Sequence, residues 1–168
     1  EIVLNQLFKM TQMQSTFGII MLALVNGQPK ILNLKELLTL YLDHRHEVVT
    51  RRTKHDLKKA EDRAHILEGL RIALENIDAV IKLIKASKTP ADAKEGLMKK
   101  FKLSEVQAQA ILDMRLQRLT NLEREKIEEE YLELIKLIAE LKGILESKTK
   151  RMNIIREELL ELKKKYGD

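Results

Sequence analysis

The first half of this chain contains a long stretch that is free of helix-breaking residues. No proline or glycine occurs between Pro29 and Gly69. Asn33, followed three residues later by Glu36, forms the capping-box pattern that marks the N-terminus of a helix. The sequence therefore predicts one helix from Asn33 to about Glu75, with a length of roughly 65 Å at ~1.5 Å per residue. Such a helix needs a partner along its side, because helices in water gain most of their stability from packing an apolar face.

A second long helix is predicted after residue 120. Thr120 and Glu123 form another capping box. Apolar residues then recur in steps of four and three, and this average period of 3.5 is typical of a coiled coil. Ser147 is a weak interruption and a possible N-cap, after which the same pattern resumes. In the first long helix the pattern fails over residues 51–55, which predicts a local change of winding.

The two long helices are expected to form the arms of an antiparallel coiled coil, because their lengths match and a separate helical segment lies between them. The predicted fold class is mainly α, with this coiled coil, a small all-helical head at its tip and a short N-terminal β-hairpin. The predicted seam of the coiled coil consists of Tyr41, Val48, Leu57, Ala64, Ile127, Tyr131, Leu134, Ile138, Leu141, Leu145, Ile155 and Leu159.

The predicted head, residues 66–120, contains three short helices. An apolar helix covers 77–85, after a possible cap at Asn76, and Thr89-Pro90 begins the next. The third helix covers 105–119 and is capped by Ser104 and Gln107. It is apolar on more than one face, whereas a surface helix has one apolar stripe, so one face is assigned to the head core and another to a second copy of the chain. The candidate residues for this dimer interface are Ile111, Met114, Arg115, Leu116 and Arg118.

The N-terminal residues are predicted to form a different structure. Residues 4–13 suit a short helix, and Phe17 to Val25 is an apolar run of strand length. Asn26-Gly27 then signals a hairpin, because both turn residues of a type I′ turn need positive φ. A lone hairpin is marginally stable, so we expect it to lean on another part of a larger protein. The chain begins with Glu-Ile-Val, which also indicates a fragment of a larger cytosolic protein.

Composition excludes several classes of protein. More than half of the residues are Ala, Glu, Lys, Leu or Arg, as in long helices. The chain has no Cys, which excludes disulfide scaffolds, thiol catalysis and cysteine-based metal sites. Its 6 Gly and 2 Pro are too few for a β-sandwich. The longest apolar run is far shorter than the ~20 residues of a membrane span, so no membrane contact and a cytoplasmic location are expected.

The charged and polar residues give no sign of catalysis. The formal net charge is +5, and the basic cluster within residues 51–63 is interleaved with acidic residues, which is typical of a solvated helix face. A basic coiled coil that binds nucleic acid remains the alternative. The four histidines lack the spacing of three or four that metal ligation from one helix requires. No catalytic, cofactor-binding or metal-ligating residue is predicted, and the isolated chain is not expected to be an enzyme.

Longer stretches carry a resemblance to a known family. They are residues 11–32 (TQMQSTFGIIMLALVNGQPKIL), 41–53 (YLDHRHEVVTRRT) and 103–120 (LSEVQAQAILDMRLQRLT), with the link AHILEGL at 64–70. Together they resemble the A subunits of bacterial type IIA DNA topoisomerases, and the gyrase members most closely. The resemblance covers essentially the whole chain, and the topoisomerase IV members are the alternative.

The resemblance implies a mechanical role. It assigns residues 1–32 to the end of a tower domain, 33–65 and 121–168 to the coiled-coil arms, and 66–120 to a head that closes the exit gate as a homodimer. DNA is the transported substrate in this family, and ATP and Mg²⁺ act through a B subunit in an assembly of two A and two B subunits. The family's catalytic tyrosine precedes residue 1, so the resemblance implies a non-catalytic segment of an ATP-dependent DNA topoisomerase.

Overall fold

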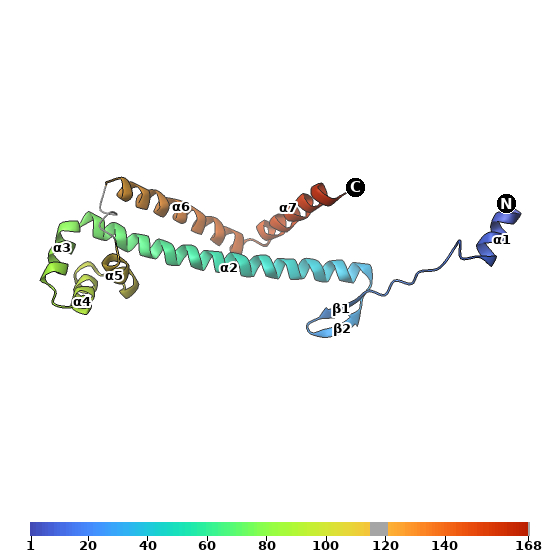
Figure 1. Ribbon diagram of the computed structural model, residues 1–168, viewed down its shortest axis with the longest axis horizontal. Coiled ribbons are helices and arrows are strands. Elements are labelled where there is room, and N and C mark those ends of the chain that lie inside the picture. Colours follow the sequence, from blue (N-terminus) through green and yellow to red (C-terminus); the bar gives the residue numbers. More distant parts are fainter. Residues whose placement is uncertain (115–120, 168) are drawn as a thin grey trace. The chain divides into compact units, whose positions relative to one another are not determined.

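The computed structural model describes residues 1–114 and 121–167, except for the side chains of residues 121 and 122. The described residues form seven helices and one two-stranded antiparallel sheet (Figure 1). The predicted mainly α fold with an N-terminal hairpin is confirmed. The chain divides into two compact units, Glu1–Arg45 and His46–Asp168. Among the described residues, no helix is both long enough and apolar enough to cross a membrane.

The first unit contains α1 (Ile2–Met10), β1 (Leu22–Val25), β2 (Gln28–Ile31) and the start of α2 (Leu34–Glu75). The hairpin turn is the predicted one, because Asn26 and Gly27 have φ values of 52° and 77° and Val25 pairs with Gln28. Leu32 is the one buried hydrophobic residue among the described residues of this unit. The unit therefore exposes most of its apolar side chains.

Two predicted boundaries in the first unit are wrong. The short helix begins and ends earlier than predicted, at Ile2 and Met10. Only the last four residues of the apolar run from Phe17 to Val25 form a strand. The reason is pairing: β2 has four residues, and a strand without a partner leaves its backbone groups unbonded. The Leu32 amide still donates to the Met21 carbonyl at 2.9 Å, and residues 17–20 lie beyond that last bond.

The long helix α2 has the predicted extent and the predicted cap. The Asn33 amide donates to Glu36 Oε2 at 3.0 Å, and the Glu36 amide donates to Asn33 Oδ1 at 2.9 Å. This reciprocal pair satisfies two of the amides that every helix N-terminus leaves without intrahelical partners. The helix has 42 residues, which corresponds to about 63 Å.

The second unit contains the rest of α2 and a head of three short helices, α3 (Ile77–Ala86), α4 (Pro90–Phe101) and α5 (Glu105–Leu112). The Thr89 and Ser104 side chains cap α4 and α5 as predicted, whereas Asn76 makes no side-chain cap and donates to the Ile72 carbonyl instead. α6 (Asn121–Glu146) and α7 (Lys148–Tyr166) follow. The buried core consists of Leu67, Leu70, Ala73, Leu74, Val80, Leu97, Leu103, Ala108, Ile111 and Ile127.

The third head helix is shorter than its prediction of 105–119. It ends at Leu112, and the Met114 amide bonds to the Ile111 carbonyl, the tighter pattern common at the last turn of a helix. Asp113, a residue of low helix propensity, occupies the C-cap. The predicted continuation over 115–119 and the predicted cap at Thr120 lie outside the described residues.

Candidate functional site

Ion pairs join α2 to α6 and α7 within the second unit. In order of falling residue number along α2, the four pairs are Arg71–Glu128, Arg63–Glu130, Glu61–Lys142 and Arg52–Glu158. The distances are 2.6, 2.7, 2.8 and 3.0 Å. Because residue numbers fall along α2 while they rise along its partners, the helices are antiparallel. Two basic residues of the predicted solvated cluster, Arg52 and Arg63, are thus engaged with carboxylates of other helices.

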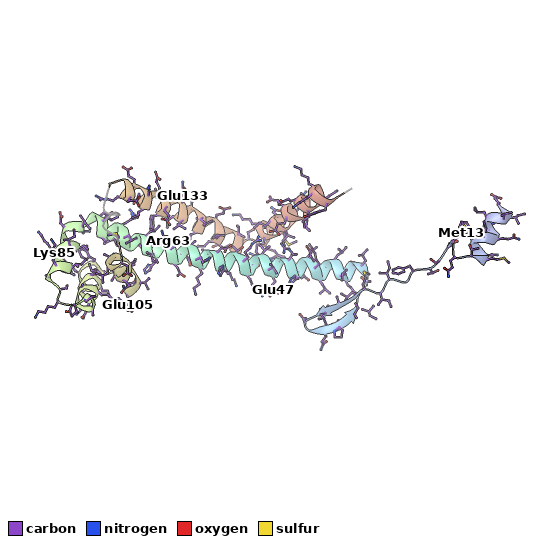
Figure 2. The ribbon with its side chains drawn as sticks, in the orientation of Figure 1. Met13, Glu47, Arg63, Lys85, Glu105 and Glu133 are labelled. Atoms are coloured by element: carbon purple, nitrogen blue, oxygen red, sulfur yellow. The ribbon has the colours of Figure 1, made fainter. Side chains whose placement is uncertain are left out.

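The pairs nearest the head have the most specific geometry. Arg63, labelled in Figure 2, donates from Nε and Nη2 to both carboxylate oxygens of Glu130, at 2.7 and 2.9 Å. This hydrogen bonding raises the pKa of Arg63. The Arg71 guanidinium lies 4.7 Å from the centre of the Tyr131 ring, a cation–π contact. Its buried Nε lies 2.6 Å from Glu128 Oε2 without hydrogen-bond alignment, so that contact is purely ionic. The bidentate contact of Arg63 with Glu130 and the stacking of Arg71 on Tyr131 are directional, and they fix the register of α2 against α6.

The predicted seam residues differ in burial. Ala64, Ile127 and Ile155 are buried, while Tyr41 and Leu159 are exposed. The half-buried members are Val48, Leu57, Tyr131, Leu134, Ile138, Leu141 and Leu145.

Val49 and Thr53 are among the buried positions on α2 that sequence reasoning missed. Thr53 lies in the stretch that does not fit the predicted pattern, yet it is only 4% exposed. Its hydroxyl donates to the Val49 carbonyl at 2.8 Å, so the polar group is satisfied within the helix. The spacing of four from Val49 to Thr53 and on to Leu57 is the signal that could have found them.

A buried polar contact attaches α5 to α2. Gln107 is 5% exposed, and its Nε2 donates to the His65 carbonyl at 2.8 Å. Its Oε1 accepts from the Ser104 amide, and Ser104 Oγ lies 2.7 Å from His65 Nε2. A Cβ on Gly69 would lie 2.7 Å from both Cβ and Cγ of Gln107. The absence of a side chain at Gly69 therefore lets Gln107 approach the helix. We call these four residues the head clasp.

The dimer-interface candidates occupy different environments. Ile111 is 3% exposed and belongs to the core of its own head, so its side chain offers no surface to a second copy. Met114 is half-buried against the same core. Arg115, Leu116 and Arg118 lie outside the described residues. On the described part of α5, the apolar residue most open to solvent is Val106, at 57% exposure.

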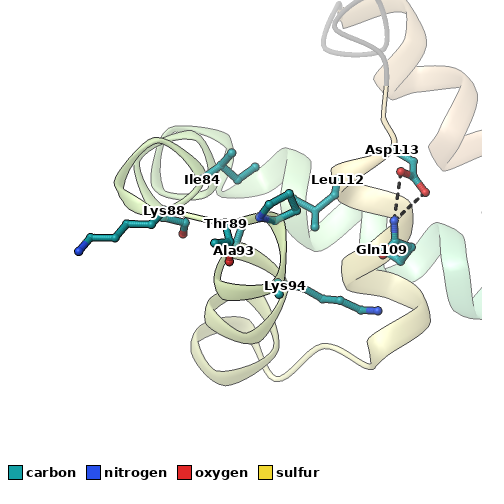
Figure 3. Close-up of a pocket in the computed structure, with 11 residues that line it drawn as sticks. Ile84, Lys88, Thr89, Ala93, Lys94, Gln109, Leu112 and Asp113 are labelled. Carbon is teal, nitrogen blue, oxygen red and sulfur yellow. Dashed lines mark hydrogen bonds between the residues drawn. The ribbon is translucent and has the colours of Figure 1, made fainter.

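A pocket of about 680 Å³ opens between α3, α4 and α5 (Figure 3). Apolar atoms of Ile84 and Leu112 line one part of it, and the side chains of Lys88, Lys94 and Asp113 line another. The side-chain Nε2 of Gln109 donates to both carboxylate oxygens of Asp113, each at 3.1 Å, as the dashed lines in Figure 3 show.

The Lys94–Glu105 pair joins α4 to α5 and predicts a pH effect. The hydrogen bond from Lys94 at 2.8 Å, with its positive charge, lowers the pKa of Glu105 from the ordinary value of 4.5. The pair therefore stabilises the fold above the unfolded pKa, and this contribution is lost as the pH falls through the lower folded pKa. An NMR titration should give a Glu105 carboxyl pKa below 4.5 that returns towards it in Lys94→Gln. An unchanged pKa in that variant would contradict the assignment.

The remaining candidates for chemistry are dispersed. Tyr41 and Tyr166 are exposed, and Tyr131 lies under Arg71. Nε of Arg151 donates to Nε2 of His46 at 3.0 Å. No group of three His, Asp or Glu side chains within the described residues is arranged to hold a metal ion.

Known proteins are similar to this chain over nearly its whole length. The family of DNA gyrase/topoisomerase IV A subunits matches residues 1–160. The chain belongs to this family. It is 63% identical over 167 residues to the DNA gyrase A subunit of Clostridium acetobutylicum and 64% identical over 167 residues to that of Halalkalibacterium halodurans. The Campylobacter fetus gyrase A subunit is 61% identical over 166 residues.

Each alignment covers 99% of this chain and 19–20% of the relative. The chain thus spans about a fifth of the length of these gyrase A subunits. The family resemblance of residues 11–32, 41–53 and 103–120 is confirmed over almost the full sequence.

Proposed function

We propose that this chain is the arm and exit-gate segment of a DNA gyrase A subunit. In this proposal α2, α6 and α7 form the arm, and the head of α3, α4 and α5 dimerises to close a gate through which a DNA duplex leaves. The observation that supports it best is the separate core of the head, which forms where the end of α2 meets the start of α6. Such a packed body at the tip of a helix pair is suited to meeting a second copy as a rigid unit.

The contacts within the arm support a mechanical role. The ion pairs of Arg63 and Arg71 fix the register of α2 against α6 immediately beside the head. The head clasp attaches α5 to the same part of α2. A displacement of the arm would therefore be passed to the head instead of being absorbed between them. Self-association of two identical heads would be isologous, with the same surface used on both sides.

The wider assembly belongs to the same proposal. The relatives are named as A subunits of DNA gyrase, which supports a gyrase over a topoisomerase IV member and DNA as the substrate. We propose a cytoplasmic assembly of two A and two B subunits, in which ATP and Mg²⁺ bind to the B subunit. The strand-cleaving tyrosine is proposed to lie in a part of the gyrase other than this chain, on the same polypeptide.

The oligomeric state tests the gate proposal. Light scattering after gel filtration at micromolar concentration is expected to give twice the 19.5 kDa chain mass. Leu116 is a candidate residue of this interface, so Leu116→Asp should weaken the dimer about tenfold or more, because a charge within an apolar interface loses its water. The matched control is Leu132→Asp on α6, which makes the same change at an exposed leucine outside the head core.

Three outcomes would contradict the gate proposal. One is a monomer at every concentration tested. Another is equal weakening of the dimer by Leu116→Asp and Leu132→Asp, which would move the contact away from the head. The third is nanomolar binding of duplex DNA by the monomeric chain with a steep salt dependence, which would favour the nucleic-acid-binding alternative.

A further inference from the structure

A single residue separates α6 from α7, and the heptad pattern of apolar residues continues across this break without a change of phase. α6 ends at Glu146 and α7 begins at Lys148, with Ser147 extended at φ −110° and ψ 113°. Figure 1 shows the two helices meeting at an angle. Yet Leu145 before the break and Met152 after it are seven residues apart, one full heptad. A break that served to correct the register would have shifted this phase.

Side chains replace the backbone bonds that the break removes. In a continuous helix the amides of residues 148, 149 and 150 would donate to the carbonyls of Ile144, Leu145 and Glu146. Here Nη1 of Arg151 donates to the Ile144 carbonyl at 3.0 Å and also to the Leu145 carbonyl. The Lys150 amide donates to Ser147 Oγ at 3.3 Å. Three of the six groups that a continuous helix would join are therefore satisfied by two side chains.

Arg151 also ties the break to the neighbouring helix. Its Nε donates to Nε2 of His46 on α2 at 3.0 Å, and both side chains are half-buried. Its guanidinium lies at the C-terminal end of α6, where the helix dipole favours a cation. The Lys150 ammonium lies close by, 2.9 Å from the place that a Cβ on Gly143 would occupy. One side chain of α7 thus contacts the end of α6 and the side of α2 together.

We propose that the α6–α7 junction is a two-state switch, in which Ser147 and Arg151 stabilise the broken state and one continuous helix is the alternative. The uninterrupted heptad phase is what the continuous helix requires. The side-chain bonds of Ser147 and Arg151 exist only when the helix is broken, so they set the population of that state. Neither state requires dimerisation of the head, so the switch and the gate proposal fail independently.

Distances between two spin labels in the full chain test the switch. The chain has no cysteine, so cysteines placed at the exposed positions Lys136 on α6 and Glu157 on α7 carry the only labels. In one continuous helix their backbones are about 31 Å apart, and the angle at the break shortens this distance. Arg151→Gln and Ser147→Ala are each expected to raise the ~31 Å population at least threefold. Alanine has the highest helix propensity and is a poor N-cap, so both properties of Ser147→Ala favour the continuous state.

Arg156→Gln is the matched control. It removes the same charge from an exposed position of the same helix, so its distance distribution should equal that of the parent chain. The switch is overturned if Arg151→Gln and Ser147→Ala both behave like Arg156→Gln. It is also overturned if they only broaden the distribution, because that describes a loose joint without a second state. Far-UV circular dichroism, taken on each labelled variant, should show helix content equal to or above that of the parent, and a lower content also counts against the switch.

Discussion

Gly69→Ala is expected to lower the free energy of unfolding by about 2 kcal/mol, in the range of overpacked sites in protein cores. The new Cβ would lie 2.7 Å from Cβ and Cγ of Gln107. These atoms are close to the α5 backbone and cannot turn away as a side-chain end can, so α5 itself must shift. That shift lengthens the 2.8 Å bond from Gln107 to the His65 carbonyl and leaves a buried amide poorly satisfied.

Urea denaturation followed by circular dichroism measures this change. Gly96→Ala is the matched control, because it also places a methyl group on a head helix. There the Cβ would meet the flexible side chain of Leu83, with Cδ2 at 3.0 Å and Cδ1 and Cγ at 3.4 Å. The better helix propensity of alanine offsets that contact, so a change within about 0.5 kcal/mol is expected. Equal effects at the two glycines would contradict the role of Gly69 in the head clasp.

Leu97→Ala is expected to cost about 2–5 kcal/mol, the range measured for large-to-small changes in cores. Leu97 is 0% exposed and belongs to the core cluster of the head. Its removal leaves a cavity that short helices fixed by Thr89 and Ser104 caps cannot close fully. For a chain of this size the midpoint of thermal unfolding should fall by roughly 4–20 °C.

The control for this change is a leucine outside the core. Leu132 on α6 is 50% exposed, so Leu132→Ala removes the same atoms from a partly solvated site. Its expected effect is below about 0.5 kcal/mol, as for most surface substitutions. If Leu97→Ala were as mild as Leu132→Ala, the head would lack the tight core described for it.

The features that the sequence predicted well depend on neighbours along the chain. The caps at Asn33, Thr89, Ser104 and Ser147 each use a side chain and an amide three residues apart. The Asn26-Gly27 turn likewise depends on the backbone freedom of two adjacent residues. Such local chemistry can be recognised without knowing where the rest of the chain lies.

The features that the sequence did not predict depend on distant partners. The strand β1 is short because β2 is short, and Gln107 is buried because Gly69 lies beneath it. Thr53 can be buried because its hydroxyl donates to the Val49 carbonyl. A pattern of apolar residues does not reveal this position, because threonine is polar. For the candidate interface, the pattern identified Ile111 as apolar but could not tell that its own head encloses it. Which apolar residues contact one another depends on how the chain packs, so the sequence pattern alone does not show it.

Because ion pairs join α2 to its antiparallel partners, the stability of these helix contacts should depend on ionic strength. Arg52, Arg63 and Glu61 meet their partners at the surface, at distances of 3.0, 2.7 and 2.8 Å. The Debye length falls from ~10 Å at 0.1 M salt to ~3 Å at 1 M, which is close to these separations. The head core is apolar, and salt does not weaken apolar burial. Raising the salt concentration should therefore weaken these three ion pairs more than the apolar contacts of the head core, so a change of buffer distinguishes the two contributions to stability without any mutation.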